Sequence, residues 1–193
     1  MKKLILVLIL CAAILFGASL GLNGLAAKNA QEEHLWLMQT ILPGSESFTA
    51  EPYAGEDANI RSVHKAENGF VVETSVYGYA GDITMLVGVS NEGRVTGLWV
   101  KEMSETFGLG ANALNDHEFL AQFLNTDGDV AIGTAGADAF SGATAEAEGE
   151  AEVYVDAITG ATVTSKAIAR SVNSAVAYVT GADVASAATS WGG

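Results

Sequence analysis

Hydroxyl and carboxyl side chains gather around a Gly-Ala pair between Asp156 and Ser165, immediately before a helical pattern. From Ser165 to Tyr178 the apolar residues recur at three- and four-residue steps, the period of an amphipathic helix. The polar stretch therefore lies at a helix N-terminus, where free backbone N–H groups and the positive end of the helix dipole favour a phosphate or carboxylate. Gly160 lets the backbone approach such a ligand closely. The pattern predicts an anion site, with Thr162 as the residue for covalent chemistry.

Two other interpretations of this stretch stay open. It could be a plain helix cap, with Thr164 as the N-cap residue and Thr159–Gly160 as a turn. The pattern is also repeated from Asp138 to Thr144, which makes Thr144 a rival for the reactive position. The acidic run that follows Thr144 would repel a phosphate diester, and this favours Thr162.

The stretch from Asp156 to Thr164 resembles the motif D-x-x-[ST]-G-A-T-x-[ST] of the FMN-binding domain family. Two further stretches resemble that family: a Gly-Tyr turn and strand from Gly78 to Val89, and the loop Ser104–Gly110, where Phe107 replaces the usual proline. In the family, the threonine that ends Gly-Ala-Thr carries flavin mononucleotide (FMN) through its phosphate. The resemblance therefore implies covalent FMN at Thr162, attached by a separate flavin transferase.

The resemblance also implies which residues surround the cofactor. Donors at the helix start would bind the remaining phosphate oxygens, with Lys166 adding charge, and polar groups beside the ring would set its redox potential. The expected cofactor-binding residues are Thr162, Asp156, Thr159, Gly160, Ala161, Thr164, Ser165, Glu105, Thr106, Gly108, Leu109 and Gly110. No catalytic residue and no metal ligand is expected.

A competing motif overlaps the second of these regions. Residues 108–113 fit the dinucleotide-binding pattern G-x-G-x-x-A, which requires a strand, a helix and a second parallel strand around it. Val130–Ile132 is the one short segment after this motif that could form the second strand. Because a strand–helix–strand unit is so poorly supported, the flavin interpretation is favoured over dinucleotide binding.

The N-terminal region predicts one membrane span. Residues 4–27 carry no charge, and the nineteen residues Leu4–Leu22 are almost all apolar, enough for about 30 Å of bilayer at 1.5 Å per residue. Lys2 and Lys3 precede the span, so the positive-inside rule places the N-terminus in the cytoplasm. The rest of the chain would lie on the outer, periplasmic or extracellular, face of a bacterial inner (cytoplasmic) membrane. The alternative is a signal peptide cleaved near residues 24–26.

Charge and cysteine content limit the function further. The chain has 23 acidic residues against 9 Lys and Arg, a net charge of −14, which disfavours nucleic acid as a partner. Its one cysteine excludes a Cys-x-x-Cys pair and a cluster held by four thiolates of this chain. Any redox function therefore needs an organic cofactor.

The patterns predict an α+β fold, in which one N-terminal transmembrane helix precedes a single FMN-binding domain with an antiparallel sheet packed by helices. Four strand-like segments separated by turn residues lie within residues 59–102 and predict a meander. Helices are expected at Asn29–Leu42, Asn115–Leu124 and from Ser165 to about Gly181, a short strand at Val153–Val155, and a surface excursion over 128–152. The expected regions are 1–27 (cytoplasmic N-terminus and span), 28–58 (juxtamembrane helix and linker), 59–181 (FMN-binding domain) and 182–193 (tail).

Among members of that family, the chain most closely resembles the G subunits of Rnf-type complexes, in length, in the single hydrophobic segment and in Ile41–Gly44 before the domain. The resemblance implies an electron-transfer subunit, working with other subunits of a membrane-bound ion-translocating ferredoxin:NAD oxidoreductase, and a relay more than a catalyst. The C subunit of sodium-translocating NADH:quinone reductase and a stand-alone extracytoplasmic FMN protein are alternatives. An acidic membrane-anchored binding module without flavin is the alternative from another class.

Overall fold

The computed structural model describes residues 26, 28–105, 110–133 and 153–182. The chain divides into two units, 1–37 and 38–193, and each is treated by itself. Within the described ranges, no helix is long and apolar enough to cross a membrane. The predicted span, Leu4–Leu22, lies outside those ranges, as does the rival threonine, Thr144.

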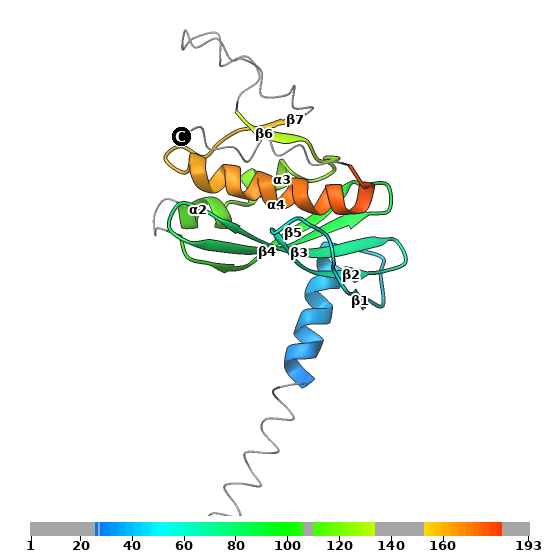
Figure 1. Cartoon of the computed structure of the whole chain (residues 1–193). Coiled ribbons are helices and arrows are strands. Elements are labelled where there is room, and N and C mark those ends of the chain that lie inside the picture. Colours follow the sequence, from blue (N-terminus) through cyan, green and yellow to red (C-terminus); the bar gives the residue numbers. More distant parts are fainter. Residues whose placement is uncertain (1–25, 27, 106–109, 134–152, 183–193) are drawn as a thin grey trace, which may run out of the picture. The chain divides into compact units, whose positions relative to one another are not determined.

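Five antiparallel strands form one sheet in chain order (Figure 1). The strands are β1 (Thr49–Glu51), β2 (Ile60–Lys65), β3 (Gly69–Tyr77), β4 (Asp82–Ser90) and β5 (Val95–Met103). The meander from β2 to β5 confirms the prediction from alternating apolar residues and turn signals. The sequence did not predict β1, because its three residues, Thr-Ala-Glu, include no β-branched or aromatic apolar side chain.

The helices differ in part from those expected. Residues 28–41 are helical, as predicted. The single helix predicted for Asn115–Leu124 is wrong, because the chain forms α2 (Gly110–Asn115) and α3 (His117–Ala121) with a break at Asp116. The Asp116 carboxylate accepts hydrogen bonds from the backbone N–H groups of Glu118 and Phe119 at 3.0 and 3.1 Å. Aspartate satisfies free N–H groups better as an N-cap than inside a helix, so a new helix starts here.

The last helix, α4 (Thr162–Thr180), begins three residues before the predicted start and ends at Gly181. Gly181 has a φ of 68°, the left-handed conformation that commonly ends a helix at glycine. The early start places Thr162 in the first turn of the helix.

A second, two-stranded sheet pairs β6 (Val130–Ile132) in parallel with β7 (Val153–Val155). The strand at Val153–Val155 confirms the prediction, but the excursion predicted from residue 128 is wrong at its start, where Val130 is buried. The side chain of Asn173 on α4 accepts from Val130 N–H at 3.0 Å and donates to Val130 C=O at 3.1 Å. This amide therefore satisfies the backbone of β6 as a neighbouring strand would. Because β6 pairs with β7 and not with β5, the dinucleotide interpretation lacks the second parallel strand that it needs beside β5.

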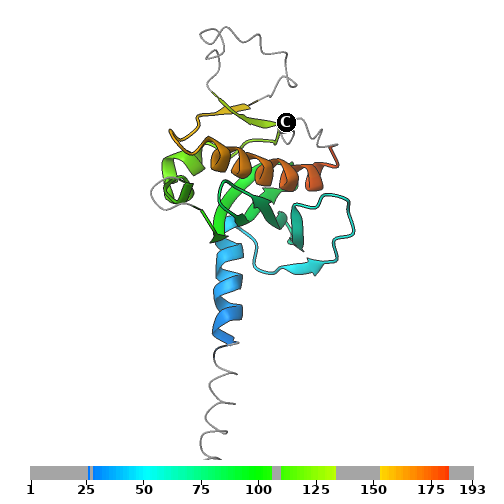
Figure 2. The same ribbon diagram turned by 60° about the vertical axis from the view of Figure 1, so that its left-hand side comes forward.

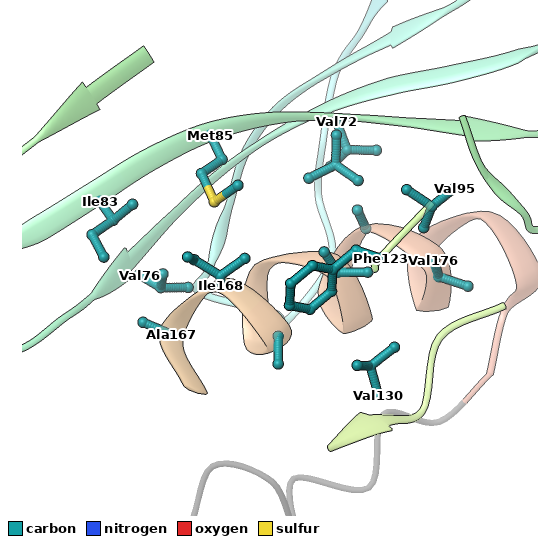
Figure 3. Packing of buried hydrophobic residues seen from close by; sticks show 14 of the residues in the cluster. Val72, Val76, Ile83, Met85, Val95, Phe123, Val130, Ala167, Ile168 and Val176 are labelled. Carbon is teal, nitrogen blue, oxygen red and sulfur yellow. The ribbon is translucent and has the colours of Figure 1, made fainter. Parts of the chain in front are cut away.

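Helix α4 lies between the two sheets (Figures 1 and 2). Figure 3 shows side chains such as Val72, Met85 and Ile168 meeting between the five-stranded sheet and α4. The opposite face of the sheet has its own small core, in which Ile41 and Leu86 are buried. Because both faces of the central strands are covered, the sheet register and the position of α4 on it are fixed together.

We expect Asn173→Ala to lower the free energy of unfolding by about 3 kcal/mol, because it leaves a buried N–H and a buried C=O of β6 unpaired. The measurement is urea unfolding of the full chain in detergent, followed by near-ultraviolet circular dichroism. Asn91→Ala is the control, since Asn91 donates to Glu67 C=O at 2.9 Å in an exposed turn. Equal effects of the two substitutions would contradict the conclusion that Asn173 holds β6 against α4.

Candidate functional site

A cavity of about 320 Å³ lies at the N-terminal end of α4. It is lined by Tyr79 from the turn after β3, Glu105 from the segment after β5, Gly110 from the start of α2, and residues 160–164. These segments belong to the three stretches that the sequence analysis selected, although more than 80 residues separate Tyr79 from Thr162. The fold therefore brings the three stretches to one place.

The turn that enters α4 leaves the helix start open. Gly160 has a φ of 80°, a conformation that side chains disfavour. The N-cap residue is Ala161, which has no side chain able to cap, so the interpretation of Thr164 as the N-cap is wrong. Among the described residues, no side chain caps the first N–H groups of α4, and the exposed Thr162 lies beside them.

Ser165 holds this turn together from inside. Its hydroxyl donates to Ala161 C=O at 2.9 Å and accepts from Ile158 N–H at 3.4 Å, and the residue is fully buried. The Ser165 hydroxyl is therefore engaged within the turn, while the exposed hydroxyl at the helix start belongs to Thr162.

The carboxylate of Glu105 joins the other walls of the cavity. One oxygen accepts from the N–H groups of Tyr79 and Ala80 at 2.8 and 3.2 Å. The other accepts from the Thr164 hydroxyl at 2.6 Å. Charge-assisted bonds of this kind are stronger than neutral ones, so Glu105 ties the turn after β3 to the first turn of α4.

Two glycines make room for that carboxylate. A Cβ at Gly78 would run into one oxygen of Glu105, and a Cβ at Gly110 would run into the other. The Gly110 position would also crowd the Thr164 hydroxyl, at 2.6 Å. A side chain at either glycine would therefore push this carboxylate out of its hydrogen-bonded position.

The remaining expected residues lie elsewhere or outside the described ranges. Asp156 and Thr159 do not line the cavity, and the Asp156 N–H donates to Gln122 Oε1 at 3.0 Å. Lys166 is exposed on α4. Thr106, Gly108 and Leu109 are outside the described part of the chain.

The sequence analysis missed several residues of this region. Tyr79 was seen only as part of a turn, and Val163 gave no signal. A second cavity of about 360 Å³ is lined by Tyr77, Gly78, Tyr79, Val163 and Arg170. Arg170 could have been noticed, because it lies seven residues after Val163, and so on nearly the same side of a helix.

Arg170 is half-buried on α4. Its Nη2 donates to Tyr77 C=O at 2.9 Å, which ties α4 to the end of β3. Burial lowers the pKa of Arg170 from its usual value, because desolvation disfavours the charged form. Within the described ranges, no carboxylate forms an ion pair with it.

The site fits a phosphate-bearing cofactor. The first cavity has the volume of a small-molecule site, which begins at about 300 Å³. Free N–H groups at the start of a long helix suit a phosphate, and the exposed Thr162 hydroxyl is at the same place. Across the described ranges, no group of three or more His, Cys, Asp or Glu residues could hold a metal ion.

One protein family, two sequence relatives and one solved structure are similar to this chain. The FMN-binding domain family matches residues 78–177. The chain is 33% identical over 161 residues to the G subunit of an ion-translocating oxidoreductase complex of Methanosarcina acetivorans, covering 77% of this chain and 76% of the relative. It is 35% identical over 111 residues to the G subunit of a proton-translocating ferredoxin:NAD(+) oxidoreductase complex of Clostridium ljungdahlii, covering 58% and 53%. The crystal structure of Shewanella oneidensis NqrC aligns at 19% identity with a TM-score of 0.44, over 75% of this chain and 73% of that one.

We expect Glu105→Ala to loosen the cavity walls, because the Tyr79 and Ala80 N–H groups and the Thr164 hydroxyl lose their acceptor. Local opening should become easier by about 2 kcal/mol, the scale of hydrogen bonds to a charged group. Hydrogen exchange read by mass spectrometry should show faster exchange in the peptide that contains Tyr79 and Ala80. Glu102→Ala, at an exposed position of β5, is the control and should leave that peptide unchanged.

Proposed function

Because the chain belongs to the FMN-binding domain family, we propose that it is an electron-transfer subunit of a membrane-bound, Rnf-type ion-translocating ferredoxin:NAD oxidoreductase. Its FMN would occupy the cavity at the start of α4. The observation that carries this proposal is the convergence of Tyr79, Glu105, Gly110 and the 160–164 turn around the exposed Thr162. The names of the Methanosarcina and Clostridium relatives supply the class of complex.

The FMN is held covalently, through an ester between its phosphate and Thr162 Oγ1. Free N–H groups in the first turn of α4 donate to the remaining phosphate oxygens, and the dipole of this 19-residue helix favours the negative charge. Gly160 gives the phosphate access to the backbone. A separate flavin transferase makes the ester, and Asp156, exposed before the turn, is available to it.

The protein's contribution is to place and retain the cofactor. Bound FMN supplies the ability to accept and release electrons. Glu105 fixes the walls of the cavity through Tyr79 and Thr164, so hydrogen bonds between distant segments hold the position of the ring. The ester keeps one flavin with each chain, which matters on an outer face of the membrane where a dissociated flavin would be diluted.

The N-terminal segment anchors the subunit in this proposal. Leu4–Leu22 spans the bilayer once, Lys2 and Lys3 remain in the cytoplasm, and the FMN-binding domain lies on the outer face. The other subunits of the complex are its redox partners. Both relatives are named as subunits of such complexes, and this supports an assembly over a stand-alone domain.

We expect peptide mass mapping of the chain from its native membrane to find FMN minus one water on the peptide that contains Thr162. Thr162→Ala should abolish this mass and the in-gel flavin fluorescence. Thr144→Ala is the matched control and should keep both signals. Flavin on Thr144 would show that Thr144, and not Thr162, is the attachment residue. An unmodified native chain would mean that residues 156–165 only form the start of a helix and carry no cofactor.

The membrane arrangement has its own test. A phosphatase fused after residue 193 should be active, and a cytoplasm-dependent fluorescent reporter at the same place should be dark, because the domain is exported. Exchanging the reporters to the N-terminus, before Lys2, should give the opposite result. Fluorescence from the C-terminal fusion would contradict the proposed orientation.

A further inference from the structure

A second cavity lies next to the cavity beside Thr162. The two cavities share Tyr79 and Val163 in their walls, so they adjoin along one side of α4. The first contains Thr162 and the second contains Arg170. Eight residues of helix separate these two side chains, a distance of about 12 Å at 1.5 Å per residue.

The charge of Arg170 has no counter-charge among the described residues. Among the described residues Arg170 forms no ion pair, and its one hydrogen bond goes to the Tyr77 carbonyl. Arg61 and Lys166 also form no ion pair with described residues, but both are exposed, whereas Arg170 is half-buried. Its Nε is buried and finds no hydrogen-bond acceptor in the described part of the chain. A guanidinium has five N–H donors, and a partly buried one with so few acceptors is costly unless a ligand supplies more.

The walls around Arg170 suit a flat aromatic group. Tyr77 and Tyr79 flank the second cavity and are 64% and 67% exposed, unusual for large aromatic side chains. Val163 lies on the helix side of the same cavity. Aromatic rings beside an apolar side chain favour stacking of another ring, and a guanidinium favours an electron-rich edge.

We propose that Arg170 faces the pyrimidine half of the flavin ring and sets its redox potential. A flavin anchored by its phosphate at Thr162 and extended past Val163 would bring its ring to Tyr79 and its carbonyl-bearing edge to Arg170. Reduction adds electrons, and hence negative charge, to that half of the ring. A nearby cation stabilises the added charge, so Arg170 favours the reduced flavin. This inference rests on the proposed function, since it needs the FMN at Thr162.

The test compares Arg170→Gln with Lys166→Gln in the full chain, purified with its flavin from cells that contain the transferase. Both substitutions remove one positive charge from α4, but Lys166 lines neither cavity. Glutamine keeps a donor for the Tyr77 carbonyl, so the fold should be retained. The readouts are the midpoint potential, from spectroelectrochemical titration, and the absorption spectrum of the oxidised flavin.

Arg170→Gln should weaken the preference for the reduced flavin by about tenfold, which is about 30 mV for a two-electron couple. It should also shift the absorption bands, and Lys166→Gln should do neither. An unchanged potential and spectrum in flavin-loaded Arg170→Gln, or an equal change in Lys166→Gln, would overturn the inference. If Arg170→Gln takes up no flavin, Arg170→Lys is used instead. Lysine keeps the charge but lacks the planar guanidinium, so the flavin spectrum of this variant should shift. An unshifted spectrum would overturn the inference. A native chain without flavin on Thr162 would instead reject the proposed function itself.

Discussion

The carboxylate of Glu105 holds together the turn after β3, the segment after β5 and the first turn of α4. These segments come from distant parts of the chain, and each forms one wall of the same cavity. The same carboxylate accounts for two glycines, because a Cβ at Gly78 or Gly110 would displace it from its hydrogen bonds. A single ionised group can do this because it accepts several charge-assisted hydrogen bonds at once.

The precision of that contact depends on how α4 is seated. Val72 and Val76 point from β3 to α4, while Val71 points to the small core on the opposite face, so a one-residue slip would exchange the two sets. On its other side α4 holds β6 through Asn173. The helix is therefore fixed from both sides. Its packing in the core, and not the loop that precedes it, places its first turn beside Glu105.

Sequence patterns predicted the elements with strong periodicity and missed those decided by single side chains. The meander and α4 follow from repeated apolar residues and clear turns, whereas the break at Asp116 and the strand at Val130 depend on one cap and one amide clamp. At the site, motif resemblance selected Thr162, Glu105 and Gly110. The bond between Glu105 and Thr164 could not be predicted, because it joins residues 59 positions apart through the packing of α4 on the sheet.

The charge of the chain explains why the site needs positive groups next to the ligand. A chain with a net charge of −14 repels anions at long range, and salt screens that repulsion beyond about 8 Å under physiological conditions. Binding a phosphate and stabilising a reduced ring must therefore rely on positive groups at contact distance. The N-terminus of α4 supplies one at Thr162, and Arg170 supplies another two turns further along the same helix. One rigid helix thus fixes the spacing of both positive groups, and an extended, doubly anionic ligand is the kind of molecule whose charges this spacing can match.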